Sequence, residues 1–214
     1  MAKGVLIFDC DGVLVDSEPI ASRILAEELT RIGLTTSYEE TIQWYMGKSD
    51  EDCLRQITDR LGHSPPPDLM ANYLFRTEQA FARKLKAIDG VRSCLEQLNG
   101  PKCVGSSGSH QKIRNSLHQT NLEHFFNGHF FSSADVKRGK PHPDLFLFAA
   151  EKMGASPDNC VVIEDSVPGV TAAAAAGMRV CGYAALTSAE KLQAAGAETF
   201  TRMKDLPKLL SDFP

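Results

Sequence analysis

Residues 4–12 read GVLIFDCDG, a continuous apolar run followed at once by two aspartates. A run without polar alternation that ends at turn-compatible residues is typical of a strand buried on both faces of a parallel sheet. Residues two apart in an extended chain point to the same side, so Asp9 and Asp11 can face one ligand. The stretch therefore predicts a buried first strand with two carboxylates at its carboxyl end.

Similar apolar runs predict further strands at residues 102–104, 160–163 and 178–183. Helical patterns lie between them, at residues 110–119, 144–153 and 166–176. Strands that alternate with helices form βαβ units, in which helices cover the faces of a parallel sheet. The expected fold class is therefore α/β, with a Rossmann-like parallel sheet as the core and helices on both of its faces.

The segment from residue 17 to residue 87 interrupts this alternation, because its periodicity is helical throughout. Apolar residues recur at helical spacing from Ile20 to Ile32, and Gly33 supplies a stop. More helices are expected near residues 38–46, 50–61 and 68–86. An all-helical block inserted after the first strand is most simply a separate domain. We therefore expect a Rossmann-like core at 1–16 and 88–214 and a helical cap domain at 17–87.

Composition argues against several classes of protein. The 214 residues carry a net charge of −4, which offers no electrostatic footprint for nucleic acid or an anionic membrane surface. The apolar run before Asp9 is too short for a signal peptide, and no stretch reaches the ~20 apolar residues of a transmembrane helix. The six cysteines form no CxxC pair, and the six histidines show no paired ligand spacing, which argues against a transition-metal site. We expect a cytoplasmic protein that is a monomer or a weak homodimer and binds neither nucleic acid nor membrane.

Four polar features follow predicted strands, at the edge of a parallel sheet where ligands bind. They are Asp9 with Asp11, Ser106, Lys140, and the pair Glu164 and Asp165. Each alone has an ordinary explanation: surface acids are common in pairs, a serine after a strand is usually a helix cap, and a lone lysine is usually solvated. Together they offer carboxylates, which Mg²⁺ prefers, along with a helix start and an ammonium group suited to phosphate. The combination predicts a phosphate-binding metal site.

Four stretches of this chain resemble the motifs of haloacid dehalogenase superfamily hydrolases. They are IFDCDGVLVDSEP at 7–19, VGSSGS at 104–109, RGKPHPDLF at 138–146 and VIEDSVPGV at 162–170. The layout is similar to the subgroup that has a helical cap after strand one and includes β-phosphoglucomutase. The resemblance covers essentially the whole chain, and its motifs are specific to the superfamily rather than to a substrate.

The resemblance implies that Asp9 attacks phosphorus and becomes an aspartyl phosphate, with Asp11 as general acid and base. It also implies Mg²⁺ held by Asp9, the backbone carbonyl of Asp11 and Asp165, with Glu164 as an additional or water-mediated ligand. Ser106 and Lys140 would hold the phosphoryl oxygens. Further substrate contacts are expected from Glu18 at the hinge, Lys48 in the cap loop and Ser107.

The implied function is an Mg²⁺-dependent phosphatase, a phosphoric monoester hydrolase acting on a small phosphorylated metabolite such as a sugar phosphate or sugar-acid phosphate. The alternative is a phosphomutase of the β-phosphoglucomutase type. That enzyme has a hinge His and a cap Arg where this chain has Ala21 and Asp50, which weakens the mutase interpretation. Dehalogenation is disfavoured because that branch lacks an acid corresponding to Asp11. A signalling receiver is disfavoured because that class is shorter and has no cap.

Overall fold

The computed structural model describes residues 4–45 and 50–213 of the chain. The chain forms two compact units, one made of Met1–Asp16 with Lys86–Pro214 and the other of Ser17–Leu85. Among the described residues, no helix is both long and apolar enough to cross a bilayer.

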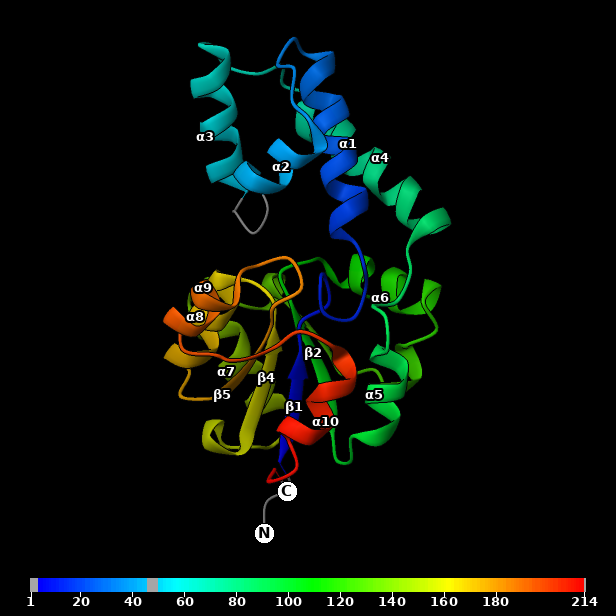
Figure 1. The fold of residues 1–214 in the computed structure, drawn as a ribbon, viewed down its shortest axis with the longest axis vertical. Helices are drawn as coiled ribbons and strands as arrows, with labels where there is room; N and C mark the ends of the chain where they lie inside the picture. The colour runs from blue at the N-terminus through cyan, green and yellow to red at the C-terminus, as the bar shows by residue number, and fades with distance from the viewer. Residues whose placement is uncertain (1–3, 46–49, 214) are drawn as a thin grey trace. The chain divides into compact units, whose positions relative to one another are not determined.

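The larger unit is built on one six-stranded sheet in the order β3-β2-β1-β4-β5-β6, and all neighbouring strands are parallel (Figure 1). Its strands are β1 Val5–Phe8, β2 Lys102–Ser106, β3 Phe130–Ser132, β4 Cys160–Glu164, β5 Arg179–Tyr183 and β6 Glu198–Phe200. The central strands β1 and β4 are buried along their whole length, which explains why their sequences are continuous apolar runs. The predicted α/β class with a parallel Rossmann-like sheet is confirmed.

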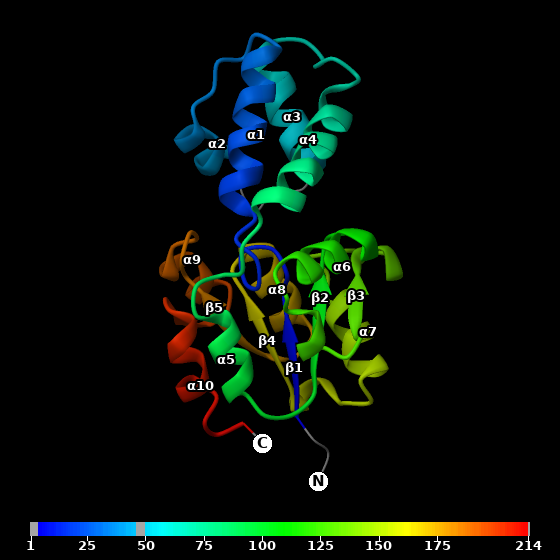
Figure 2. The same cartoon turned by 90° about the vertical axis from the view of Figure 1, so that its right-hand side faces the viewer.

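Helices cover both faces of this sheet (Figure 2). They are α5 Val91–Gln97, α6 His110–Gln119, α7 Asp144–Lys152, α8 Val167–Ala175, α9 Ala189–Ala194 and α10 Leu206–Leu209. Helices α7, α8 and α9 share one apolar cluster with alternate residues of the strands, including Val5 and Ile7 of β1. On the other face, Phe126 packs edge-on against Phe8, with 6.0 Å between ring centroids. The sheet is therefore held rigidly from both sides.

Over its described residues, 17–45 and 50–85, the smaller unit contains four helices, α1 Glu18–Arg31, α2 Tyr38–Tyr45, α3 Asp50–Leu61 and α4 Leu69–Lys84. Its own apolar core includes Leu29 of α1, Ile57 of α3 and Leu69 of α4. The buried Glu28 accepts a 2.7 Å hydrogen bond from Arg76, which links α1 to α4. That this helical unit acts as a cap remains a prediction.

The two connections to the helical unit are paired with each other inside the core unit. Asp16 N donates to Lys86 O over 2.9 Å, and Val15 forms an antiparallel bridge with Ala87. The insertion therefore leaves and re-enters the core at one place, directly after the loop that carries Asp9 and Asp11.

Candidate active site

The candidate site lies at the carboxyl ends of the three central strands, β2, β1 and β4. Strand order runs outward from β1 to β3 on one side and from β4 to β6 on the other, and ligands of open parallel sheets bind at such a switch point. The register aligns Phe8 with Val104 of β2 and with Ile163 of β4. The residues that follow these strands therefore emerge together at one edge.

Asp9 is the first residue after β1, and Lys140 reaches it from the loop between β3 and α7. Lys140 Nζ lies 2.8 Å from Asp9 Oδ1 and 2.6 Å from Glu164 Oε1. Burial raises the pKa of Asp9 to about 7, although Lys140 opposes part of this effect. Burial also disfavours the charge on Lys140, but its two carboxylate partners raise its pKa above the ordinary value. Lys140 is thus a buried cation held between two buried carboxylates of the site.

Glu164 is the last residue of β4 and is completely buried. Its Oε1 accepts from Lys140, and its Oε2 accepts from Asp165 N, Ser166 N and Ser166 Oγ at 2.8–2.9 Å. A Cβ on Gly169 would lie 1.8 Å from this carboxylate, so only glycine leaves room for it. Both oxygens of Glu164 are thus committed to bonds within the protein, and its main effect in this structure is to fix Lys140.

The acids of the site fit a divalent cation. Asp9, Glu164 and Asp165 can each offer a carboxylate oxygen, and these oxygens lie within 4.8 Å of one another. Gly12, with φ +76°, leaves space for the Asp165 carboxylate, because a Cβ there would lie 2.1 Å from Oδ2. Hard oxygen donors grouped in this way are the ligands that Mg²⁺ selects.

The two carboxylate oxygens of Asp11 have different surroundings. Its Oδ2 lies 2.7 Å from Lys112 Nζ, whereas its Oδ1 is buried and has no hydrogen-bond partner within the described part of the chain. Sequence reasoning missed Lys112. A cation in the first turn of a helix is unfavourable for the helix dipole, and that position in α6 was the available signal.

Ser106 ends β2 and is buried, and its Oγ accepts from Gly108 N over 3.1 Å. The loop that follows is braced by the neighbouring turn: Ser132 Oγ donates to Gly108 O and Ser133 Oγ donates to Ser107 O, both over 2.7 Å. The Ser107 residue is exposed. The structure therefore brings the Ser106 loop, a fixed helix start, to the same edge of the sheet as Asp9.

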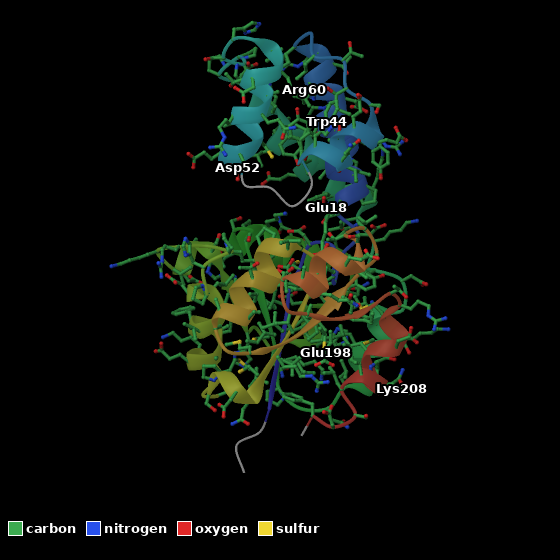
Figure 3. The ribbon with its side chains drawn as sticks, turned by 60° about the vertical axis from the view of Figure 1, so that its left-hand side comes forward. Glu18, Trp44, Asp52, Arg60, Glu198 and Lys208 are labelled. Carbon is green, nitrogen blue, oxygen red and sulfur yellow. The ribbon has the colours of Figure 1, made fainter. Side chains whose placement is uncertain are left out.

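The predicted substrate contacts of the helical unit are described only in part. Glu18 is the first residue of α1. Lys48 lies outside the described residues, and so does the side chain of Asp50. Within this unit, Figure 3 shows Arg60 of α3 beside Trp44 of α2, and the guanidinium lies 3.8 Å from the ring centroid. Sequence reasoning did not single out this pair.

Comparison with known proteins supports the fold and the family. A sequence model of the haloacid dehalogenase-like hydrolase family matches residues 6–183. The chain is 34% identical over 209 residues to the 6-phosphogluconate phosphatase of Escherichia coli (strain K12), covering 95% of this chain and 93% of that protein.

Two solved structures are similar over nearly the whole chain. A conserved haloacid dehalogenase-like protein of unknown function from Agrobacterium tumefaciens str. C58 has a TM-score of 0.91 at 37% identity, covering 99% of both chains. A HAD family hydrolase from Deinococcus radiodurans R1, crystallised with bound phosphate and sodium, has a TM-score of 0.83 at 31% identity, covering 98% of this chain and 96% of that one. Together with the family match, these similarities confirm the resemblance carried by the four motifs, and the chain belongs to the haloacid dehalogenase-like hydrolase family.

Proposed function

We propose that this hydrolase is an Mg²⁺-dependent phosphatase that removes phosphate from a small phosphorylated metabolite through an aspartyl phosphate on Asp9. The enzyme class, a phosphoric monoester hydrolase, follows from the family match and from phosphatase relatives of high coverage. The observation that carries the finer proposal is the convergence of Asp9, Lys140, Glu164 and Asp165 at the end of β1. A sugar phosphate or sugar-acid phosphate is the proposed substrate, because a relative spanning nearly the whole chain is a 6-phosphogluconate phosphatase.

In the proposed reaction, a carboxylate oxygen of Asp9 attacks phosphorus and the bond to the ester oxygen breaks. Asp11 gives its proton to that oxygen, and the alcohol leaves. Water then attacks phosphorus, Asp11 takes a proton from the water, and the bond to Asp9 breaks to release inorganic phosphate. Two half-reactions thus return both aspartates to their starting states.

The remaining residues stabilise charge. Lys140 and the Ser106 loop would bind the phosphoryl oxygens, where negative charge accumulates during transfer. Mg²⁺, held by Asp9, the Asp11 carbonyl and Asp165, would neutralise part of the phosphate charge and favour the ionised form of Asp9. Glu164 would keep Lys140 in place and could reach the metal through water.

The helical unit is proposed to act as the cap that reads the rest of the substrate, with Glu18 and Lys48 as its contacts. Ser107 of the core unit is a further proposed contact. Arg60 stacked on Trp44 offers this unit a rigid cation. A cytoplasmic location, without nucleic-acid or membrane partners, remains part of the proposal.

The proposal is tested by measuring phosphate release from sugar phosphates, sugar-acid phosphates, nucleotides and phosphoglycolate, with Mg²⁺ or with EDTA. We expect Mg²⁺-dependent turnover that is highest on the first two groups. An Asp9→Asn preparation controls for contaminating phosphatases and should be inactive. Asp165→Ala should need far more Mg²⁺ or stay inactive. Turnover in EDTA that remains after the rate of the Asp9→Asn preparation is subtracted would refute the metal dependence, and an Asp9→Asn preparation as active as wild-type protein would refute the role of Asp9.

A further inference from the structure

Among the described residues, Lys112 is a cation at this edge of the sheet to which the proposed reaction gives no task. It stands in the first turn of α6, where Ser109 caps the helix by accepting from Lys112 N over 3.3 Å. Its ammonium contacts Asp11 Oδ2 at 2.7 Å, although the two residues are 101 positions apart in the sequence.

Stability of the fold does not explain this contact. A cation at a helix start opposes the helix dipole. The two side chains are 34% and 21% exposed, and ion pairs that solvent can reach contribute little to stability. The pairing is therefore better explained by what it does to Asp11.

A second observation concerns the path of the lysine stem. A Cβ on Gly108 would lie 3.1 Å from Lys112 Cδ and 3.5 Å from Ser106 Oγ. The backbone at Gly108 does not need positive φ, so close approach is the reason that glycine suits this position. The stem thus passes close to the Ser106 loop on its way to Asp11.

We propose that Lys112 is a positioning residue that holds Oδ2 of Asp11 and leaves Oδ1 as the oxygen that exchanges the proton with substrate and water. This inference rests on the proposed phosphatase function. Oδ1 is buried and lacks a hydrogen-bond donor within the described residues, so a reacting group can occupy that direction.

The division between the two oxygens fits both half-reactions. In the first, the Oδ1–H bond breaks as the ester oxygen leaves, and Asp11 is left as a carboxylate beside the Lys112 ammonium. In the second, Oδ1 takes a proton from the attacking water, and Oδ2 still accepts from Lys112. No other reactant is needed, because the proton is returned to Asp11 within the cycle.

The test compares substrates that need a proton on the leaving group with one that does not. Hydrolysis of a sugar phosphate releases an alkoxide that must be protonated, whereas 4-nitrophenyl phosphate releases a stable phenolate. Lys112→Met keeps an unbranched side chain of nearly the same length and removes its charge. We expect it to lower kcat for the sugar phosphate about tenfold to a hundredfold, with little change in KM. For 4-nitrophenyl phosphate, the rate of the first turnover, which reports transfer of phosphate to Asp9 before water attacks, should fall by no more than about threefold. Lys112→Arg should recover most of the loss.

Arg114→Met is the matched control, because it removes one exposed cation from the same helix and should leave both activities unchanged. A loss in the first-turnover rate with 4-nitrophenyl phosphate as large as the loss with the sugar phosphate would overturn the inference, and so would a rise in KM at constant kcat. A Lys112→Met variant as active as the Arg114→Met control would also overturn it. Failure of the proposed function has a different signature, since wild-type protein would then release phosphate from neither substrate, and both claims would fall.

Discussion

Lys140 and Glu164 form an ion pair that is closed to solvent, with Nζ 2.6 Å from Oε1 and side-chain exposures of 6% and 0%. The same ammonium lies 2.8 Å from Asp9 Oδ1. Because Lys140 is held between the Glu164 carboxylate and Asp9, the proposed nucleophile, its side chain has almost no conformational freedom. The site is therefore organised before any substrate arrives, which is what electrostatic stabilisation of phosphoryl transfer requires.

This pair should matter for folding as well as for turnover. Lys140→Met would leave Glu164 as a buried, unpaired charge, and losing one partner of such a pair costs about 3–5 kcal/mol. We expect a loss of that size in urea denaturation, together with loss of phosphatase activity. Lys137→Met, which removes an exposed lysine from the same loop, is the control. Equal stability of the two variants would show that Lys140 is not paired as described.

Asp9 should make metal-free protein less stable as pH rises. Its pKa is raised by burial from 3.8 to about 7, so the folded protein binds more protons than the unfolded chain between these values. The stability of wild-type protein relative to Asp9→Asn should therefore fall between about pH 4 and pH 7 and then level off. Melting curves in EDTA should show a difference on the order of 2–4 kcal/mol above pH 7.

A loss of stability with rising pH is the result that the buried Asp9 carboxyl predicts. Asp158→Asn, which removes an exposed aspartate, should give no such pH dependence. A constant difference between wild type and Asp9→Asn from pH 4 to pH 8 would contradict the assigned burial of Asp9.

A substitution at Gly12 would displace the carboxylate of Asp165 without changing Asp165 itself. Alanine at Gly12 would be strained at φ +76° and would place a Cβ 2.1 Å from Asp165 Oδ2. Gly154→Ala is the control, because Gly154 has a similar φ of +69° but a Cβ added there would meet no atom within 4 Å. Both variants should lose about 1–2 kcal/mol of stability through backbone strain. Only Gly12→Ala should raise the Mg²⁺ concentration for half-maximal activity, by about tenfold or more. Equal Mg²⁺ requirements in the two variants would show that Asp165 does not bind the metal.

The residues of the helical unit lead us to expect that the protein hydrolyses sugar phosphates rather than isomerising them. A mutase must hold a second phosphate while a bisphosphate intermediate turns around, and an arginine suits that task through its two hydrogen bonds. This chain has Asp50 and Ala21 near the corresponding places, and an aspartate would repel the dianion. With β-glucose 1-phosphate and a trace of sugar bisphosphate, free phosphate should therefore form faster than glucose 6-phosphate. The reverse order would favour a phosphomutase.

Much of the core could be predicted because its central strands are buried on both faces. The runs at β1 and β4 are continuous and apolar, and the acids that follow them mark the edge where ligands bind. Strands β3 and β6 were missed because each has only three residues. Strand β6 also lies at the sheet edge and begins with the exposed Glu198, so it carries no apolar run.

The site was predictable to the extent that its residues follow strands. Asp9, Ser106 and Glu164 each end or follow a strand, and topology then brings them together. Lys112 lies inside a helix, and its partner is set by how α6 packs against the sheet rather than by any local pattern. The commitment of both Glu164 oxygens to internal bonds was likewise invisible in the sequence, because it depends on the absence of a side chain at Gly169.

The most direct test of the central claim is to trap the covalent intermediate. Protein turning over a sugar phosphate with Mg²⁺ would be quenched in acid and reduced with borohydride, which converts an aspartyl phosphate to homoserine. Peptide mass spectrometry should then find homoserine at position 9 alone, with none in the EDTA-treated sample. Steady phosphate release with no modified peptide, or with the modification at another acid, would contradict the assignment of Asp9 as the nucleophile.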